Sequence, residues 1–128
     1  MKLLGSSTII GLRTHTNAGG EHRFKRARRV ATERESAYLA ALVALPPRNP
    51  LPTTGRFVVG LTRVSPATRP PDDDNARVAM KHVRDGIADR LGVDDGDTSR
   101  VRWEYATERG PWGVRFTVAL EDLGRSRT

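Results

Sequence analysis

Residues 71–95 constrain the fold more than any other stretch of this sequence. Between two acidic clusters, at 72–75 and 94–97, apolar side chains recur at intervals of three and four residues, the period of a helix with one buried face. The spacing predicts a single helix after Asn75. Its expected core positions are Ala76, Met80, Val83, Ile87 and Leu91. Gly92 follows directly, and glycine at this place favours a left-handed helix end.

The acidic clusters stand out because the chain as a whole is basic. Its formal net charge is +7, and six of its fifteen acidic residues lie in the two clusters. Of the 22 basic residues, 19 are arginine, whose planar guanidinium can bind a phosphate through two hydrogen bonds. Host amino-acid usage or solubility can produce the same composition. We nevertheless expect nucleic acid ahead of other polyanions, with an acidic site facing it.

Length and composition limit the class of protein. A chain of 128 residues with 37% hydrophobic residues can form one compact core, so we expect a single domain over 1–128 with a frayed tail at 124–128. Because cysteine is absent, disulfides, zinc–thiolate sites and cysteine nucleophiles are excluded. No run of sequence approaches the ~20 apolar residues of a membrane span, and the first residues lack the pattern of a signal peptide. We therefore expect a cytoplasmic protein with no membrane partner.

The other expected elements are strands and one more helix. Apolar alternation predicts strands at 7–12, 56–64, 101–106 and 114–120, the last two joined as a hairpin. Thr32 and Glu35 fit a capping box, which predicts a core-facing helix at 33–45. Its expected core positions are Ala37, Tyr38, Ala41, Leu42 and Leu45. The expected fold is α+β, a small mixed sheet with two main helices and a C-terminal β-hairpin.

A basic segment at 23–29 precedes this second helix. Its charged residues are Arg23, Lys25, Arg26, Arg28 and Arg29. The segment is either an extended arm that faces phosphates or the solvated face of an arginine-rich helix. The residues alone leave both interpretations open.

The spacing of the acidic residues is compatible with a metal site. In an extended segment residues two apart point the same way, so Asp72 and Asp74 can converge. Asp94 and Asp95 return after one helix length and can close the same site. Mg²⁺ takes such oxygen ligands in octahedral geometry; it lowers the pKa of a bound water and neutralises charge on a phosphate.

Lys81 and Asp85 would share a helix face with Asp74, because they follow it by seven and eleven residues. An amine at this place would stabilise the negative charge that develops on a phosphate under attack, or steer the attacking water.

The same residues also suit purely structural roles. Carboxylates before a helix cap its free amides and favour its dipole, and 94–97 has the composition of an ordinary turn. The 12-residue EF-hand spacing is absent. His15, His22 and His82 show no metal-ligand spacing. Trp103 and Trp112 flank the expected hairpin, and we assign them to core or turn ahead of the alternative, platforms on which bases stack. Capping with a turn and a metal site both stay open at this point.

The order of these features resembles the RusA family of Holliday junction resolvases. The family pattern is Asp-x-Asp-Asn, a helix with lysine and aspartate four residues apart, and Gly-x-Asp-Asp before a β-hairpin. It falls here on Asp72, Asp74, Asn75, Lys81, Asp85, Asp94 and Asp95. One departure concerns the lysine, which in the family lies three residues after the asparagine, where this chain has Val78. The resemblance covers most of the chain from the basic segment to Val101.

This resemblance implies a homodimeric, Mg²⁺-dependent endonuclease, with Mn²⁺ as a substitute ion, from a bacterial or phage-infected cell. Such an enzyme resolves four-way DNA junctions by symmetric phosphodiester hydrolysis, in DNA recombination and repair. The implied catalytic residues are Asp72, Asp74, Asp95 and Lys81, and the implied metal ligands are Asp72, Asp74, Asp94 and Asp95. The implied DNA contacts are Arg23, Lys25, Arg26, Arg28, Arg29, Arg69, Arg77 and Arg84.

Two alternatives from other classes remain. The first is a non-catalytic basic DNA-binding phage accessory protein, in which the carboxylates only cap helices and form turns. The second is an acid-rich structural module that binds Ca²⁺.

Overall fold

The computed structural model of the chain describes residues 1–14, 23–48, 50–66 and 73–121, with the backbone alone at 73–75. The elements are β1 (Lys2–Ile10), α1 (Arg23–Ala44), β2 (Arg56–Ser65), α2 (Asp73–Ala79), α3 (Lys81–Leu91), β3 (Val101–Arg109) and β4 (Gly113–Glu121). The expected α+β class is confirmed: the described residues form a four-stranded mixed sheet and three helices.

The sheet has the strand order β1-β4-β2-β3. β4 runs antiparallel to both of its neighbours, whereas β2 and β3 are parallel. The predicted hairpin of the last two strands is therefore wrong, because β2 lies between them. Their connection crosses the end of β2, where the amide of Gly110 donates to the carbonyl of Ser65 at 2.9 Å. Two strand spacings are about 10 Å, which three extended residues can span.

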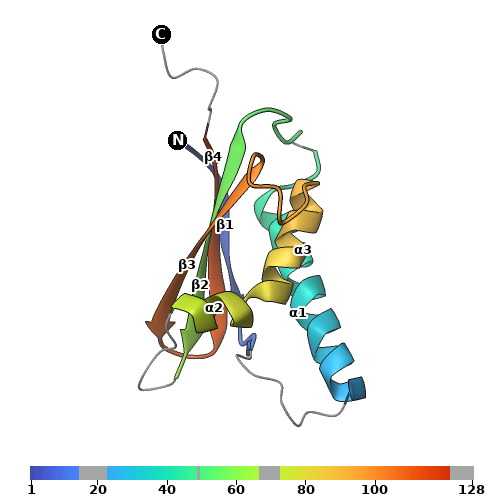
Figure 1. Cartoon of the computed structure of the whole chain (residues 1–128), viewed down its shortest axis with the longest axis vertical. Coiled ribbons are helices and arrows are strands. Elements are labelled where there is room, and N and C mark those ends of the chain that lie inside the picture. The colour runs from blue at the N-terminus through green and yellow to red at the C-terminus, as the bar shows by residue number, and fades with distance from the viewer. Residues whose placement is uncertain (15–22, 49, 67–72, 122–128) are drawn as a thin grey trace.

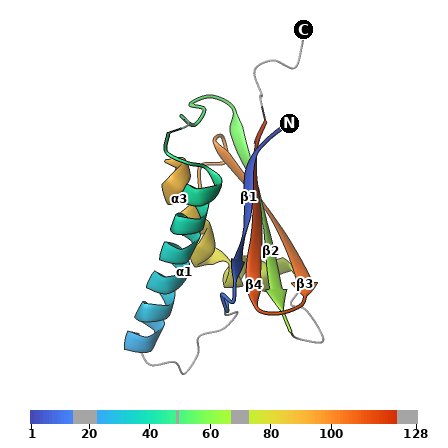
Figure 2. The same cartoon turned by 180° about the vertical axis from the view of Figure 1, so that it is seen from behind.

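Helices α1 and α3 pack on one side of the sheet, as Figures 1 and 2 show from opposite sides. They bury the side chains that β2 and β4 direct toward them. The largest of these are Phe57 and Leu61 on β2 and Phe116 on β4, each at most 1% exposed. All five expected core positions of the 76–91 stretch are buried, so the periodicity identified this part of the core.

The two helices approach each other closely at Gly86. A Cβ atom there would lie 2.2 Å from the carbonyl oxygen of Arg34 and 2.9 Å from the Cβ of Ala37. Such distances are sterically forbidden, so α1 and α3 can touch here only because residue 86 has no side chain. At the surface, Arg34 donates two hydrogen bonds to the carboxylate of Asp89, at 2.8 and 3.0 Å, and these also join the two helices.

Helix α1 begins ten residues before its predicted start. Thr32 therefore lies in the helix interior and the predicted capping box is wrong. The basic segment is helical because arginine, lysine and alanine are favourable helix formers. Within the predicted core face, Ala37, Ala41 and Leu45 are buried, but Tyr38 is 37% exposed and Leu42 is partly exposed.

The first strand also differs from its prediction. It covers Lys2–Ile10 instead of 7–12, because its register follows β4 from Leu120 back to Gly113. Gly5 would ordinarily weaken a strand. Its close approach to the end of α1, where a Cβ would lie 2.6 Å from the Ala44 carbonyl oxygen, explains why a glycine stands there. The predicted strand at 56–64 is confirmed and is one residue longer.

The single helix predicted after Asn75 is in fact two helices. Met80 joins them with φ −97° and ψ 5°, and α2 runs crosswise to α3 (Figure 1). Backbone hydrogen bonds continue on both sides, from Met80 to Ala76 and from Arg84 to Met80. The change of direction lets α2 contact β3 while α3 packs on α1. Gly92 ends α3 with φ 71°, as predicted.

Candidate active site

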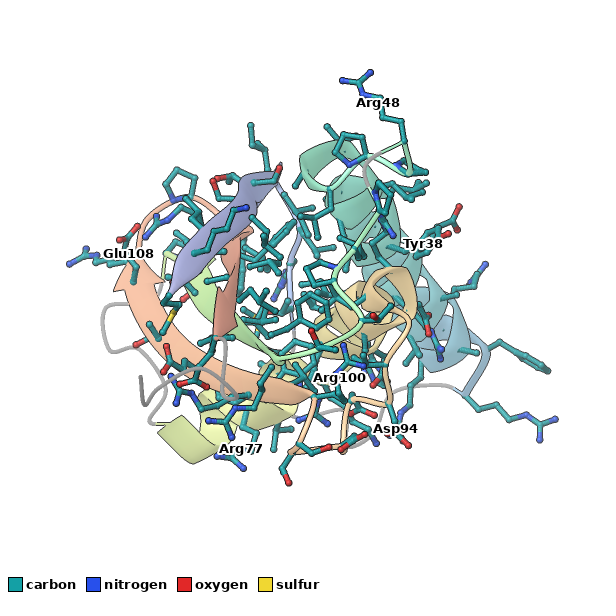
Figure 3. All side chains as sticks on the ribbon, turned by 90° about the horizontal axis from the view of Figure 1, so that it is seen from above. Tyr38, Arg48, Arg77, Asp94, Arg100 and Glu108 are labelled. Atoms are coloured by element: carbon teal, nitrogen blue, oxygen red, sulfur yellow. The ribbon has the colours of Figure 1, made fainter. Side chains whose placement is uncertain are left out.

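An open pocket of about 320 Å³ lies where α2, the start of α3, the loop after α3 and β3 meet. Its lining includes four arginines and one carboxylate, which are Arg56, Arg77, Arg84, Arg102 and Asp95. β3 is an edge strand, so the pocket opens beside the last strand of the sheet. Figure 3 shows Arg77 and Asp94 toward the same side of the molecule, away from Arg48.

Asp95 is held in this pocket by contacts to its backbone and its side chain. The indole nitrogen of Trp103 donates to the Asp95 carbonyl oxygen at 2.9 Å. The Nε of Arg84 lies 3.0 Å from Oδ2 of Asp95, an ion pair without the alignment of a hydrogen bond. The Asp95 side chain is 32% exposed, so a ligand in the pocket can reach it.

Arg84 is the residue that connects this carboxylate to the rest of the pocket. Its Nη1 donates to the hydroxyl of Tyr105 at 3.0 Å. Partial burial lowers the pKa of Arg84, but the hydrogen bond to Tyr105 and the charges of Asp95 and Asp85 outweigh it and raise that pKa. The guanidinium therefore stays charged and compensates the carboxylates around it.

Asp85 is a second carboxylate beside Asp95. Burial raises the pKa of Asp85, and the negative charge of Asp95 raises it further. His82 on the same helix turn lies 4.0 Å from the Asp85 carboxylate, and burial lowers the pKa of that imidazole. Arg84 and Arg34 act in the opposite direction and lower the pKa of Asp85, and a bound cation would lower it in the same way.

The acidic turn that follows α3 uses two of its carboxylates internally. Oδ1 of Asp94 accepts a hydrogen bond from the Gly96 amide at 2.9 Å. Oδ1 of Asp97 accepts from the amide of Ser99 at 3.1 Å and from its hydroxyl at 2.6 Å, and these bonds lower the pKa of Asp97. The structural interpretation of this cluster is thus correct for Asp97. Asp94 is exposed and has one oxygen engaged in the turn.

Part of the predicted metal site lies outside the described residues. These are Asp72 and the side chain of Asp74, so their convergence with Asp95 stays a prediction. The extended backbone from which it was predicted is wrong at Asp74, because α2 begins at Asp73. Among the side chains that are described, no three acidic or histidine residues form a group that could hold a metal ion. The candidate donors are all carboxylate oxygens, which is the chemistry that Mg²⁺ prefers.

Lys81 is exposed at the first position of α3. The face that it was expected to share with Asp74 does not exist as predicted, because the helix direction changes at Met80. Asp85 remains four residues after Lys81 on the same helix.

The basic segment forms the first turns of α1, so it is a helix face and not an extended arm. Arg23, Lys25, Arg26 and Arg28 are exposed there. Arg29 differs, since its Nη1 lies 3.0 Å from the buried carboxylate of Glu33. Arg69 is outside the described residues, whereas Arg77 and Arg84 both line the pocket.

Six pocket residues were not predicted as functional: Arg56, Thr98, Val101, Arg102, Trp103 and Tyr105. Strand alternation does place Trp103 and Tyr105 on one face, but it does not reveal that β3 is at the sheet edge. The edge position depends on the insertion of β2 between β3 and β4.

The described part of the chain contains no helix that is both long and apolar enough to cross a membrane. A segment of 45 residues, 35% of this chain, is 47% identical to an uncharacterized protein from Xylella fastidiosa (strain Temecula1 / ATCC 700964). The match spans 29% of that protein's length. No family model matches the sequence, and no solved structure matches it. The function must therefore be argued from the site.

Proposed function

We propose that this protein is a Mg²⁺-dependent, structure-specific endonuclease of the RusA type that resolves four-way DNA junctions. The observation that carries the proposal is a partly exposed carboxylate, Asp95, in a pocket lined by four arginines. Arginine attracts and orients phosphate, while a carboxylate beside phosphate is repelled unless a cation lies between them. A carboxylate among arginines therefore suits the hydrolysis of a phosphodiester better than it suits the binding of DNA without hydrolysis.

The metal would be held by Asp72, Asp74 and Asp95, with Asp94 adjacent, and Mn²⁺ would substitute for Mg²⁺. When bound, such an ion neutralises phosphate charge and makes a water more acidic. Burial first and the charge of Asp95 second raise the pKa of Asp85, and a cation held beside Asp95 would favour the charged form of both carboxylates.

The remaining groups of the pocket would bind and orient the substrate. Arg77 and Arg102 would contact phosphates of the strand to be cut, and Arg84 fixes the position of the Asp95 carboxylate. Lys81, exposed at the start of α3, would supply positive charge where negative charge builds on the attacked phosphate. Water would then add to phosphorus and lose a proton to solvent, while the bond from phosphorus to one strand oxygen breaks. That oxygen would take a proton from solvent and leave as a hydroxyl, so the nick carries a phosphomonoester on one side and an alcohol on the other.

The proposal includes a two-fold homodimer in the cytoplasm of a bacterial or phage-infected cell. A four-way junction presents two equivalent strands, so two sites related by a two-fold axis match the symmetry of the substrate. The exposed basic face of α1 would add contacts to the DNA backbone, which hold the duplex arms without reading their sequence.

A second candidate is a DNA-binding protein without catalysis. The turn contacts of Asp94 and Asp97 favour it, as does the ion pair that already compensates Asp95. In that case the pocket would bind phosphate through its arginines, and the carboxylates would only order the loop.

Asp95→Asn separates the two candidates. Loss of a metal ligand costs several kcal/mol of transition-state stabilisation, so junction cleavage should fall at least about a hundredfold, while junction binding is kept or improves. Asp89→Asn is the matched control, because Asp89 lies near the end of α3, outside the pocket, and pairs with Arg34. Cleavage by Asp95→Asn at the rate of the unmodified protein would remove Asp95 from the catalytic site. Binding without cleavage by all three proteins would favour the second candidate.

A further inference from the structure

Two aromatic side chains form part of the pocket wall beside Asp95. Trp103 and Tyr105 lie two residues apart on β3, so both point to the helix side of the sheet. Each packs against the core and also lines the pocket. Because β3 is an edge strand, the rings reach an opening and are not enclosed by another strand. Both rings are partly exposed.

Guanidinium groups already stack over these rings. The Arg84 guanidinium carbon lies 6.0 Å from the ring centre of Trp103, and that of Arg77 lies 5.3 Å from the ring centre of Tyr105. Unpaired nucleobases stack on aromatic rings and on guanidinium planes alike. A planar ligand in the pocket can therefore stack on an aromatic ring or on a guanidinium plane.

The arginines of the pocket differ in whether a carboxylate lies close enough to pair with them. Glu121 lies 2.7 Å from Arg56 and 3.7 Å from Arg102, and Asp95 compensates Arg84. Arg77 is exposed and makes no ion pair with any other described side chain. Its guanidinium lies over the Tyr105 ring at the exposed wall of the pocket, where a phosphate can reach it.

From these contacts we infer that the pocket binds one unstacked nucleotide of a DNA strand, with its base on Trp103 and its phosphate on Arg77, which lies over the Tyr105 ring. A volume of about 320 Å³ is near the lower end for ligand pockets, which suits a single nucleotide and excludes a duplex. An aromatic platform in a basic groove is the usual composition of a site for single-stranded nucleic acid. The inference rests on the proposed function only in taking DNA as the ligand; it needs neither metal nor cleavage.

The first test uses Trp103 as its own reporter. The chain has two tryptophans, so Trp112→Phe leaves Trp103 as the single indole. This protein is titrated in chelator with a short oligothymidylate and with an abasic oligomer of the same length. We expect the base-containing oligomer to quench the Trp103 emission and to bind roughly tenfold or more tightly than the abasic one, since stacking of a base on an aromatic ring is strong. Equal binding of both oligomers, or no change in emission, would overturn the inference.

The second test addresses the phosphate contact. In the Trp112→Phe background, Arg77→Gln should weaken oligothymidylate binding about tenfold through loss of a charge-assisted hydrogen bond. Arg115→Gln removes the same charge from a residue that pairs with Glu108 outside the pocket, and it should change the affinity less than about twofold. Equal weakening by both variants would show that charge alone, and not the pocket, binds the strand.

These outcomes are separable from those of the proposed function. A protein that cleaves junctions but shows no base-dependent quenching keeps the nuclease assignment and loses the nucleotide pocket. A protein that shows quenching and cuts nothing keeps the pocket and loses the nuclease assignment.

Discussion

Arg84 and Asp95 form an ion pair of 3.0 Å that joins the first turn of α3 to the loop after that helix. Asp85 follows Arg84 directly on the helix. Burial first and Asp95 second raise the pKa of Asp85, whereas Arg84 lowers it. The carboxylate of Asp85, beside the pocket, is therefore only partly compensated. This imbalance is the electrostatic feature that the proposed metal site would use.

Asp85→Asn should stabilise the protein at neutral pH. Burial first, and Asp95 second, raise the pKa of Asp85 in the folded protein. The folded protein therefore keeps Asp85 protonated to a higher pH than the unfolded chain does. The free energy of unfolding falls as the pH rises from the ordinary pKa of 3.8 through the raised pKa of the folded protein. The variant should have a higher Tm at pH 7 and no advantage once the pH is below the ordinary pKa of aspartate. Thermal unfolding at both pH values measures this, and a lower Tm at pH 7 would contradict it.

Gly86→Ala should destabilise the fold although alanine is the better helix former. The added Cβ would lie 2.2 Å from a backbone carbonyl oxygen of α1, so the two helices must separate. Overpacking of this kind costs about 1–3 kcal/mol, and a clash with backbone belongs at the upper end, whereas the gain in helix propensity is about 1 kcal/mol. We expect a net loss of about 2 kcal/mol in urea unfolding.

Gly96→Ala is the control for this prediction. The Cβ added there would be 3.6 Å from its nearest neighbour, so the change should stay within about 0.5 kcal/mol. If both glycine variants were equally stable, the close approach of α1 and α3 at Gly86 would be wrong.

The double variant Lys25→Gln with Arg28→Gln, two residues three apart on one face of α1, should weaken junction binding through the DNA backbone alone. Both residues are exposed on the first turns of α1. Each phosphate contact contributes about one unit to the slope of log affinity against log salt, so the slope should fall by about two units. The weakening should be similar for junctions of different sequence. Binding titrations at several salt concentrations measure the slope, and an unchanged slope would exclude this face from the DNA contacts.

The buried stripe from Ala76 to Leu91 could be predicted because helical periodicity reports directly which side chains face a core. The change of helix direction at Met80 could not be predicted, because the helical spacing of apolar residues continues across it. The apolar residues of α2 and those of α3 pack against different neighbours. The start of α1 was missed for a related reason. Thr32 and Glu35 have the composition of a helix start, but the favourable residues before them extend the helix.

We predicted a hairpin because strands adjacent in sequence are usually adjacent in the sheet. Here β2 takes the place between β3 and β4, and no local signal at Gly110 indicates that its turn spans two strand spacings. The candidate site follows from the same fact. Asp95 could be identified from its position after Gly92, whereas the pocket of Trp103 and Tyr105 exists only because β3 is left at the edge.

The most direct test of the proposed function is cleavage of a labelled synthetic four-way junction, beside a linear duplex of the same sequence, with Mg²⁺, with Ca²⁺ and with chelator. We predict paired symmetric nicks in the junction only, and only with Mg²⁺ among these three conditions. Salt-sensitive binding to the junction with no cutting under any metal would contradict the proposal, and would leave a basic DNA-binding protein whose acidic residues order its helix ends and turns.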